Sequence, residues 1–324
     1  MIPTSITTIA GLLGLVFGSF LNVCVSRWPE EESVVKGRSH CRSCGRTLTW
    51  WENVPLASWL ALRGRCSTCK AQIGWRYPLV ELAVASLWAF ASWHVLAGAF
   101  DAALPIDVLC YQLSVLIGLM IFLWLLVALA VLDAENLWLP DRLTWPGIVM
   151  GILAIYLWLT AATRLSQHHF DAVPLSTLPI MSMESMMGLQ DFLQLIRFPG
   201  IDSPLAGWLL LIAGPLVAAG AMFLIRWLYW LVRRREGLGL GDVKLMAMLA
   251  AWLGLDGAML AFTIGCALGA LTALFMLAIP RSRTGGPHWA LQKLPFGTFL
   301  CLGAVVSVFW GGSLIALYAR WAGF

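Results

Sequence analysis

The chain has 324 residues, of which 60% are hydrophobic and 12% are charged, and its formal net charge is +4. Soluble domains are about 45–50% apolar and about 25% charged, so this composition excludes an ordinary soluble domain. The positive excess lies in a few loops and not along one surface, so we expect no nucleic-acid partner.

Apolar runs long enough to cross a bilayer recur along the chain. A helix needs about 20 such residues to span the hydrocarbon core. The sequence therefore predicts an all-α polytopic membrane protein with about eight transmembrane helices in the lipid bilayer. The predicted spans are residues 5–26, 80–100, 109–132, 143–162, 205–232, 240–255, 257–280 and 296–318.

Basic residues fall mainly in alternate loops. Seventeen of the twenty-one Lys and Arg residues lie in four loops, 27–78, 134–142, 233–244 and 281–293. Because basic loops are retained in the cytoplasm, we expect these loops to be cytoplasmic and both termini to be periplasmic. No basic residue precedes Arg27 and no small-residue cleavage site follows the first span, which is therefore predicted to be retained.

Residues 29–78 contain two C-x2-C pairs separated by twenty-one residues. Each pair can turn two thiolates toward one ion, and this spacing is typical of zinc ribbons. We therefore expect a small cytoplasmic zinc-ribbon-like domain between the first two helices, because so short a piece cannot readily build its own core. Two disulfides are the alternative, which a reducing cytoplasm disfavours. The four ligands of this structural zinc would be Cys41, Cys44, Cys66 and Cys69.

Three aspartates are predicted to lie at one depth of the helix bundle. The alternation of spans places Asp133 at the cytoplasmic end of the third span and Asp242 at the start of the sixth, while Asp141 directly precedes the fourth. Each can be interpreted as a helix cap or a solvated helix end. A carboxylate at the mouth of a membrane segment is costly, however, and is a functional candidate. Their common depth favours the functional interpretation.

A long connection, residues 163–204, is predicted on the outer side. Its histidines, His168 and His169, and its four methionines suggest soft-metal binding as one interpretation. Apolar residues at helical spacing from Leu189 to Ile196 favour instead a short helix that lies on the membrane surface.

Five motifs, taken in order along the chain, resemble the type IV prepilin peptidase family, the membrane aspartyl proteases with a GxGD motif. The resemblance covers almost the whole chain. The motifs are GSFLNV at 18–23, the cysteine pairs running into RYPLVE at 76–81, Asp133 with LPD at 139–141, GLGDVK at 239–244 and PFG at 295–297.

The resemblance implies a bifunctional enzyme of the bacterial inner (cytoplasmic) membrane. It would remove the leader peptide from type IV prepilins or type II secretion pseudopilins at the cytoplasmic face, and would N-methylate the new N-terminal residue with S-adenosylmethionine. Asp133 and Asp242 match the catalytic positions, and two such carboxylates sharing one proton can act as base and acid. The supporting positions are Asp141, Gly239, Gly241 and Lys244.

The implied domains are a first transmembrane helix at 1–28, the zinc domain at 29–78, two helices at 79–132 and a peptidase membrane domain at 133–324. The zinc domain has no Rossmann-type glycine loop, so we expect the methyl donor at its junction with the membrane. The candidate residues there are Glu52, Gly64 and Arg65. Arg65 stands where the family usually has lysine, which differs from arginine in hydration and hydrogen-bond geometry.

Three alternatives stay open. One is a peptidase without methyl transfer, which the arginine at position 65 allows. Another is a non-catalytic zinc-ribbon membrane adaptor, which would tolerate loss of Asp133 or Asp242. The third is an ion transporter, but transporters place acidic residues near the bilayer midplane within paired repeats, whereas these aspartates are predicted at helix ends.

Overall fold

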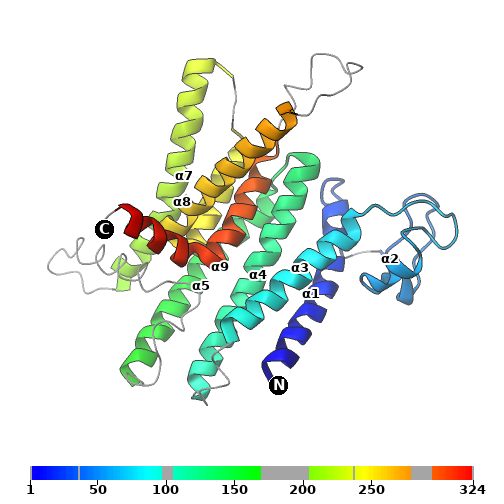
Figure 1. The fold of residues 1–324 in the computed structure, drawn as a ribbon, viewed down its shortest axis with the longest axis horizontal. Coiled ribbons are helices and arrows are strands. Elements are labelled where there is room, and N and C mark those ends of the chain that lie inside the picture. The colour runs from blue at the N-terminus through cyan, green and yellow to red at the C-terminus, as the bar shows by residue number, and fades with distance from the viewer. Residues whose placement is uncertain are drawn as a thin grey trace. The chain divides into compact units, whose positions relative to one another are not determined.

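The computed structural model describes residues 2–35, 37–96, 105–168, 204–235, 238–278 and 294–322. Within these ranges the regular elements are helices, and the only β-pairings are two isolated bridges. Seven helices are long and apolar enough to cross a membrane, which confirms the predicted all-α polytopic fold (Figure 1). They are α1 (Ile2–Arg27), α3 (Arg76–Leu96), α4 (Ile106–Asn136), α5 (Asp141–His168), α7 (Pro204–Arg233), α8 (Leu240–Ala278) and α9 (Phe296–Ala322).

The predicted outer connection lies almost entirely outside the described residues. The helix α5 extends to His168, beyond the predicted span at 143–162. Residues 169–203 are not among those described, and they include His169, the methionines and the predicted surface helix. Those expectations therefore stay predictions.

The helix α8 contains two of the predicted spans, 240–255 and 257–280. Gly254 interrupts it with φ 73° and ψ 177°. Glycine adopts such a conformation readily because it has no Cβ. The described helix thus consists of two arms joined at this glycine, which agrees with the predicted pair of spans.

The two arms of α8 run in opposite directions beside α9. Just after the break, a Cβ at Gly257 would lie 3.3 Å from Ser307 Oγ, in the middle of α9. Further along, a Cβ at Gly265 would lie 3.2 Å from Leu300 Cα, close to the start of α9. The first arm begins at this same end, so the chain enters the bundle, turns and returns (yellow to orange in Figure 1).

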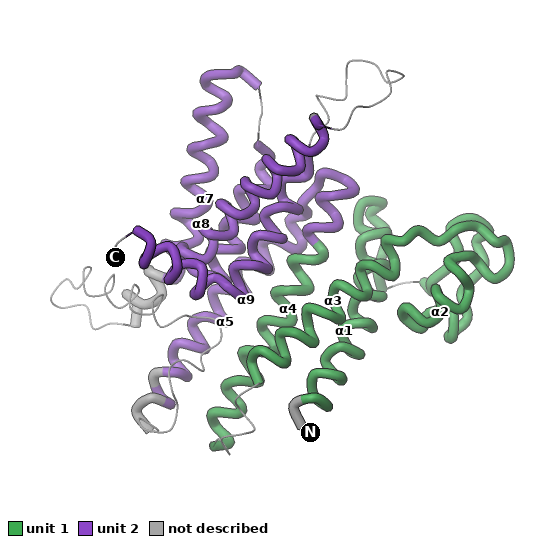
Figure 2. Tube along the Cα trace, in the orientation of Figure 1, with its two compact units in different colours: residues 1–128 green, residues 129–324 purple. Residues whose placement is uncertain are grey.

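The chain divides into two compact units, residues 1–128 and 129–324, with the division inside α4 (Figure 2). In unit 1, α1 packs closely on α3. A Cβ at Gly14 would lie 2.6 Å from Ala85 Cα, and one at Gly18 would lie 2.7 Å from Glu81 Cα. Glycine at these positions permits this approach of the two backbones.

In unit 2, α5 packs against the first arm of α8. The indole of Trp252 donates a hydrogen bond from Nε1 to the carbonyl oxygen of Gly147 at 2.8 Å. Its ring occupies the space left by Gly151, where a Cβ would come within 2.7 Å of Trp252 Cδ1. This contact sets the height of α5 along α8 and therefore the height of the residues in their first turns.

Candidate active site and metal centre

The four cysteines lie in two turns that have the same backbone pattern. The N–H of Cys41 donates to the carbonyl of Arg46, and the N–H of Cys66 donates to the carbonyl of Ala71, both at 2.9 Å. An isolated antiparallel bridge closes each turn. The residue after the second cysteine of each pair has positive φ: Gly45 (71°) and Lys70 (59°). The two C-x2-C pairs are therefore equivalent knuckles, a local repeat that the sequence alone did not reveal.

The cysteine thiols converge on one point. All four sulfur atoms lie within 4.8 Å of one another, and Cys41 Sγ and Cys69 Sγ are 3.8 Å apart. Tetrahedral Zn–S bonds of about 2.3 Å require S–S separations of about 3.8 Å. Backbone N–H groups of Cys69 and Thr68 lower the pKa of the Cys66 thiol to about 6, whereas burial and the neighbouring thiols raise the pKa of Cys69 to about 11. All four thiols are free, so this geometry favours a metal over the disulfide alternative.

Glu52 links the two knuckles through its buried carboxylate. Its Oε1 accepts hydrogen bonds from Arg46 Nη2 at 2.6 Å and Ser67 Oγ at 2.5 Å. Its Oε2 accepts from the backbone N–H of Thr49 at 2.8 Å and the Thr49 hydroxyl at 2.7 Å. These bonds, Arg46 foremost, hold the pKa of Glu52 well below its usual range. The chain's own groups thus occupy both oxygens of this predicted methyl-donor residue.

Replacing Glu52 with alanine should loosen the segment between α1 and α3 that carries the four cysteines, called the cysteine-rich segment below. Arg46, Ser67 and the Thr49 N–H would lose their acceptor, and unpaired buried donors are costly. We expect a melting temperature lower by several degrees and faster release of bound zinc to a chelator. The control is Glu30→Ala, which removes a side chain that is 55% exposed and lies 3.5 Å from Arg42, so its effect should be small. Equal losses in the two variants would contradict this role of Glu52.

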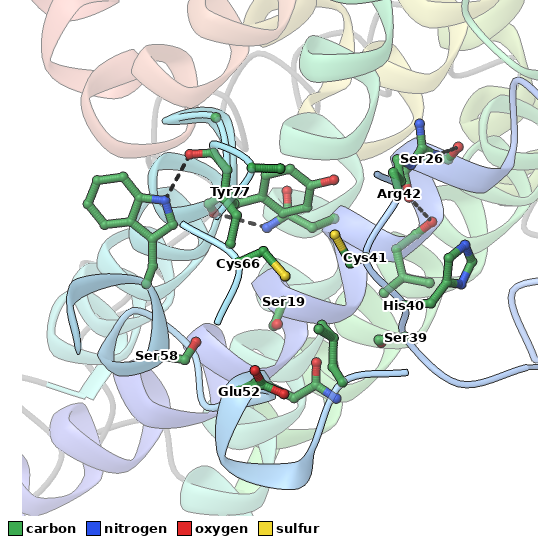
Figure 3. A pocket seen from close by; sticks show the side chains of 18 of the residues that line it. Ser19, Ser26, Ser39, His40, Cys41, Arg42, Glu52, Ser58, Cys66 and Tyr77 are labelled. Carbon is green, nitrogen blue, oxygen red and sulfur yellow. Dashed lines mark hydrogen bonds between the residues drawn. The ribbon is translucent and has the colours of Figure 1, made fainter. Parts of the chain in front are cut away.

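A cavity of about 630 Å³ lies in unit 1 between α1, the start of α3 and the cysteine-rich segment. Figure 3 shows Glu52, Ser19 and Tyr77 around it. The other two predicted methyl-donor residues do not line this cavity. Gly64, with φ 65°, lies beneath the ring of Trp59, and Arg65 forms the second bridge with Gln72.

In unit 2, Asp133 lies in the last turn of α4 and is only 5% exposed. Its Oδ2 accepts a hydrogen bond from the backbone N–H of Thr298 at 2.8 Å, and the Thr298 hydroxyl lies 3.3 Å from the same oxygen. That hydroxyl is also 2.9 Å from the carbonyl oxygen of Ala130. The first turn of α9 therefore orients the carboxylate at the end of α4.

Asp242 lies in the first turn of α8 and is 8% exposed. Its Oδ2 accepts a hydrogen bond from the backbone N–H of Gly239 at 3.2 Å. The carboxylates of Asp242 and Asp133 are close enough to interact electrostatically, and the buried thiol of Cys301 is within reach of both. Two acidic groups 109 residues apart in the sequence are thus brought together at one end of unit 2.

The side chain of Leu139 packs against Gly241, next to Asp242, and against Gly297, next to Asp133. A Cβ at Gly241 would lie 2.9 Å from Leu139 Cβ. A Cβ at Gly297 would lie 3.0 Å from both Leu139 Cδ1 and Asp133 Oδ2. Gly241 therefore gives room to a neighbouring side chain of the same unit. Gly239, whose Cβ would be 3.4 Å from Asp242 Oδ2, keeps a more open face.

Two basic residues hold the loops that carry this site. Lys244 Nζ donates to Asp141 Oδ1 at 2.5 Å and joins the first turns of α8 and α5. Arg226 of α7 donates from Nη1 to the carbonyl of Leu238 at 3.0 Å, directly before the GxGD motif. Sequence reasoning did not identify Arg226 or Thr298. An arginine within an apolar span was the available signal for the first, whereas Thr298 carries none.

Lys244→Met and Asp141→Asn should weaken leader cleavage to a similar and modest extent. The pair is partly exposed, with side chains 31% and 59% accessible, and such pairs contribute about 0.2–1 kcal/mol. We therefore expect kcat/KM to fall by no more than about fivefold in either variant. The double variant should be no worse than either single one, because both remove the same interaction. Fully additive losses would show that the two residues act separately.

Two protein-family models match this chain. The model of the bacterial peptidase A24 N-terminal domain matches residues 12–95, and that of the type IV leader peptidase family matches residues 193–274. Asp242 lies within the second match, while Asp133 lies between the two. No solved structure matches this chain.

Curated relatives extend over nearly the full length. A prepilin leader peptidase/N-methyltransferase of Pseudomonas aeruginosa is 32% identical over 97% of this chain and 93% of its own length. Proteins of the same name are 30% identical in Stutzerimonas stutzeri, over 99% and 96%, and 33% identical in Burkholderia pseudomallei, over 93% and 84%.

The fold and the two sites define a polytopic membrane protein that combines a four-cysteine module with a buried aspartate pair. Its similarity to these relatives over nearly the full length identifies its family. The chain belongs to the type IV leader peptidase family.

Proposed function

We propose that this chain cleaves the leader peptide from prepilins and N-methylates the new N-terminal residue. One observation carries the cleavage proposal: the buried carboxylates of Asp133 and Asp242 come from α4 and α8 and lie within range of each other. The names of the relatives support both activities. Type IV prepilins or type II secretion pseudopilins are the proposed substrates.

The proposed hydrolysis divides the work between the two carboxyl groups. One is ionised and takes a proton from the attacking water, while the other is protonated and donates a hydrogen bond to the scissile carbonyl. In this proposal the two carboxyl groups share a proton and titrate as a unit. The hydrogen bonds from Thr298 and Gly239 engage Oδ2 of each aspartate. We assign Oδ1 of each to water or substrate.

We place this chemistry at the cytoplasmic face of the bacterial inner membrane. Seven long apolar helices support a multi-pass protein. The basic loops 27–78, 134–142 and 233–244 would be retained inside. This assigns the cysteine-rich segment and the ends of the helices that carry the aspartates to the cytoplasmic side, with both termini outside.

Unit 1 is the proposed site of methyl transfer, with a structural zinc held by the four cysteines. S-adenosylmethionine, when bound, supplies the methyl group. The 630 Å³ cavity falls within the range of small-molecule sites, about 300–1,000 Å³. Asn22 is a residue of its wall, and its buried Oδ1 has no hydrogen-bond partner, which fits a polar ligand. The residues that would hold and orient the ligand are Ser19, Asn22, Tyr77 and Glu81.

Mass spectrometry of a prepilin substrate tests this proposal directly. Purified protein in detergent is incubated with a prepilin, with and without S-adenosylmethionine. We expect leader removal in both samples and an added methyl group only with the donor. Leader removal without methylation in either sample would leave a peptidase alone, and an intact prepilin would favour the adaptor or transporter alternatives.

A further inference from the structure

The inner wall of the unit 1 cavity is formed by polar residues of two membrane-spanning helices. Ser19 and Asn22 of α1, and Tyr77 and Glu81 of α3, are among the residues that line it. Figure 3 shows the side chains of Ser19, Tyr77 and Cys66 among those that line the cavity. A polar group inside a membrane span is costly unless it is paired, so these residues require an explanation.

Asn22 is one of the residues that line this cavity, and its side chain has an unused acceptor. Its side chain is buried, with 3% exposure, and its Nδ2 donates to the carbonyl oxygen of Tyr77 at 2.9 Å. A carbonyl can only accept, so this bond fixes which end of the amide is nitrogen. The opposite atom, Asn22 Oδ1, has no hydrogen-bond partner. A buried acceptor in this state costs free energy that a ligand donor can recover.

Glu81 adds a buried carboxyl group on the lining of the same cavity. The residue is 7% exposed, and its Oε2 accepts a hydrogen bond from the backbone N–H of Leu56 at 2.8 Å. The side chains of Ser19 and Asn22 are its other polar neighbours. Among the residues that the structure describes, no lysine or arginine forms an ion pair with it. The described part of the chain therefore supplies no cation that would pair with this carboxyl group when it is ionised.

We propose that Glu81, Asn22 and Ser19 form a binding site for a primary ammonium group. Such a group has a positive charge and three N–H donors, which match a carboxylate and a free amide oxygen on one wall. A sulfonium has the charge but no N–H, so it cannot satisfy Asn22 Oδ1. This inference rests on the proposed methyl-transfer function of unit 1, because both of its reactants carry an α-ammonium: the amino-acid end of S-adenosylmethionine and the new N-terminal residue of the pilin.

Direct binding measurements on full-length protein in detergent test the site. S-adenosylmethionine is titrated by calorimetry, and a peptide with the mature pilin N-terminus is titrated separately, with a free or an acetylated amine. We compare the wild type with Glu81→Gln, which removes the charge but keeps an oxygen for the Leu56 N–H. The matched control is Glu30→Gln, which removes an equal charge from an exposed position on the cavity rim.

We expect Glu81→Gln to raise the Kd of at least one ammonium-bearing ligand by about tenfold or more, as loss of a charge-assisted hydrogen bond requires. Glu30→Gln should leave that Kd unchanged. The ligand whose Kd rises identifies which reactant supplies the ammonium. If it is the peptide, the acetylated form should bind wild type and Glu81→Gln with the same Kd. Unchanged affinities for both ligands would overturn the site while leaving the proposed function in place.

A second variant tests the site in case Glu81→Gln does not fold. Asn22→Ala deletes the unused acceptor and should weaken the same ligand in the same direction. Zinc content serves as the folding check for both variants. Wild-type protein that binds neither ligand would overturn the ammonium site and the proposed methyl transfer together.

Discussion

Replacing either Asp133 or Asp242 with asparagine should abolish leader cleavage while the protein still inserts and folds. Asparagine has the size of aspartate, and its amide oxygen can still accept the hydrogen bonds from Thr298 or Gly239. It cannot take a proton from water or share one with the other carboxylate. Loss of general acid–base catalysis costs about 10²–10⁴-fold, so we expect kcat to fall by at least about a hundredfold with little change in KM. Single-turnover leader release measures this.

Asp256→Asn provides the matched control for this experiment. Asp256 lies on the same helix as Asp242 but is exposed, two residues beyond the break at Gly254. It carries the same charge and is remote from the aspartate pair along the first arm of α8, so its replacement should leave cleavage unchanged. Substantial cleavage by Asp133→Asn or Asp242→Asn would remove the proposed dyad.

Cys41→Ser should unfold the cysteine-rich segment and eliminate methyl transfer. Structural zinc in small domains contributes about 10–16 kcal/mol of binding free energy. A segment of about fifty residues would otherwise have only a few kcal/mol of stability, at about 0.05–0.15 kcal/mol per residue. We expect zinc content to fall to background and amide hydrogen exchange between residues 38 and 75 to lose its protection.

Leader cleavage should fall less than methyl transfer in this variant, because the hydrogen-bond partners of Asp133 and Asp242 belong to unit 2. Cys110→Ser is the control, since Cys110 is exposed and lies outside the cluster. It should retain zinc and both activities. A Cys41→Ser protein with full zinc content and full protection would show that the four thiols do not form a metal site.

The proximity of Asp133 and Asp242 can be predicted from sequence, because hydrophobic span lengths and basic loops indicate the depth of each residue in the membrane. Span lengths and basic loops assign each aspartate to a helix end, and alternation assigns both ends to one face. The lateral contacts are not encoded in the same way. Lipid and protein core are both apolar, so the hydrophobic pattern of α9 does not indicate which side faces Asp133. Thr298, which holds that carboxylate, therefore needed the structure.

The residues predicted to bind the methyl donor show a second limit of prediction from sequence. Glu52 is predicted from its place near the membrane junction, but the segment Thr49-Trp50-Trp51-Glu52 also has the pattern of a capping box, and the structure contains that motif. The local signal therefore pointed to a structural carboxylate. Glu81 stood inside the predicted span 80–100, where an acidic residue indicates a functional site. Its significance depends on the cavity, which arises only when α1, α3 and the cysteine-rich segment pack together.

Gly297 determines how much room the carboxyl group of Asp133 has. The position of its absent Cβ lies 3.0 Å from Asp133 Oδ2 and 3.0 Å from Leu139 Cδ1, with Asp133 Cγ at 3.1 Å. Even alanine, the smallest alternative, would press on an acidic oxygen and an aliphatic branch at once. The carboxyl group of Asp133 thus owes its placement to a missing methyl group on α9. Because the conflict at position 297 is one of atomic volume, the size of a replacement side chain, more than its charge, decides whether it is tolerated.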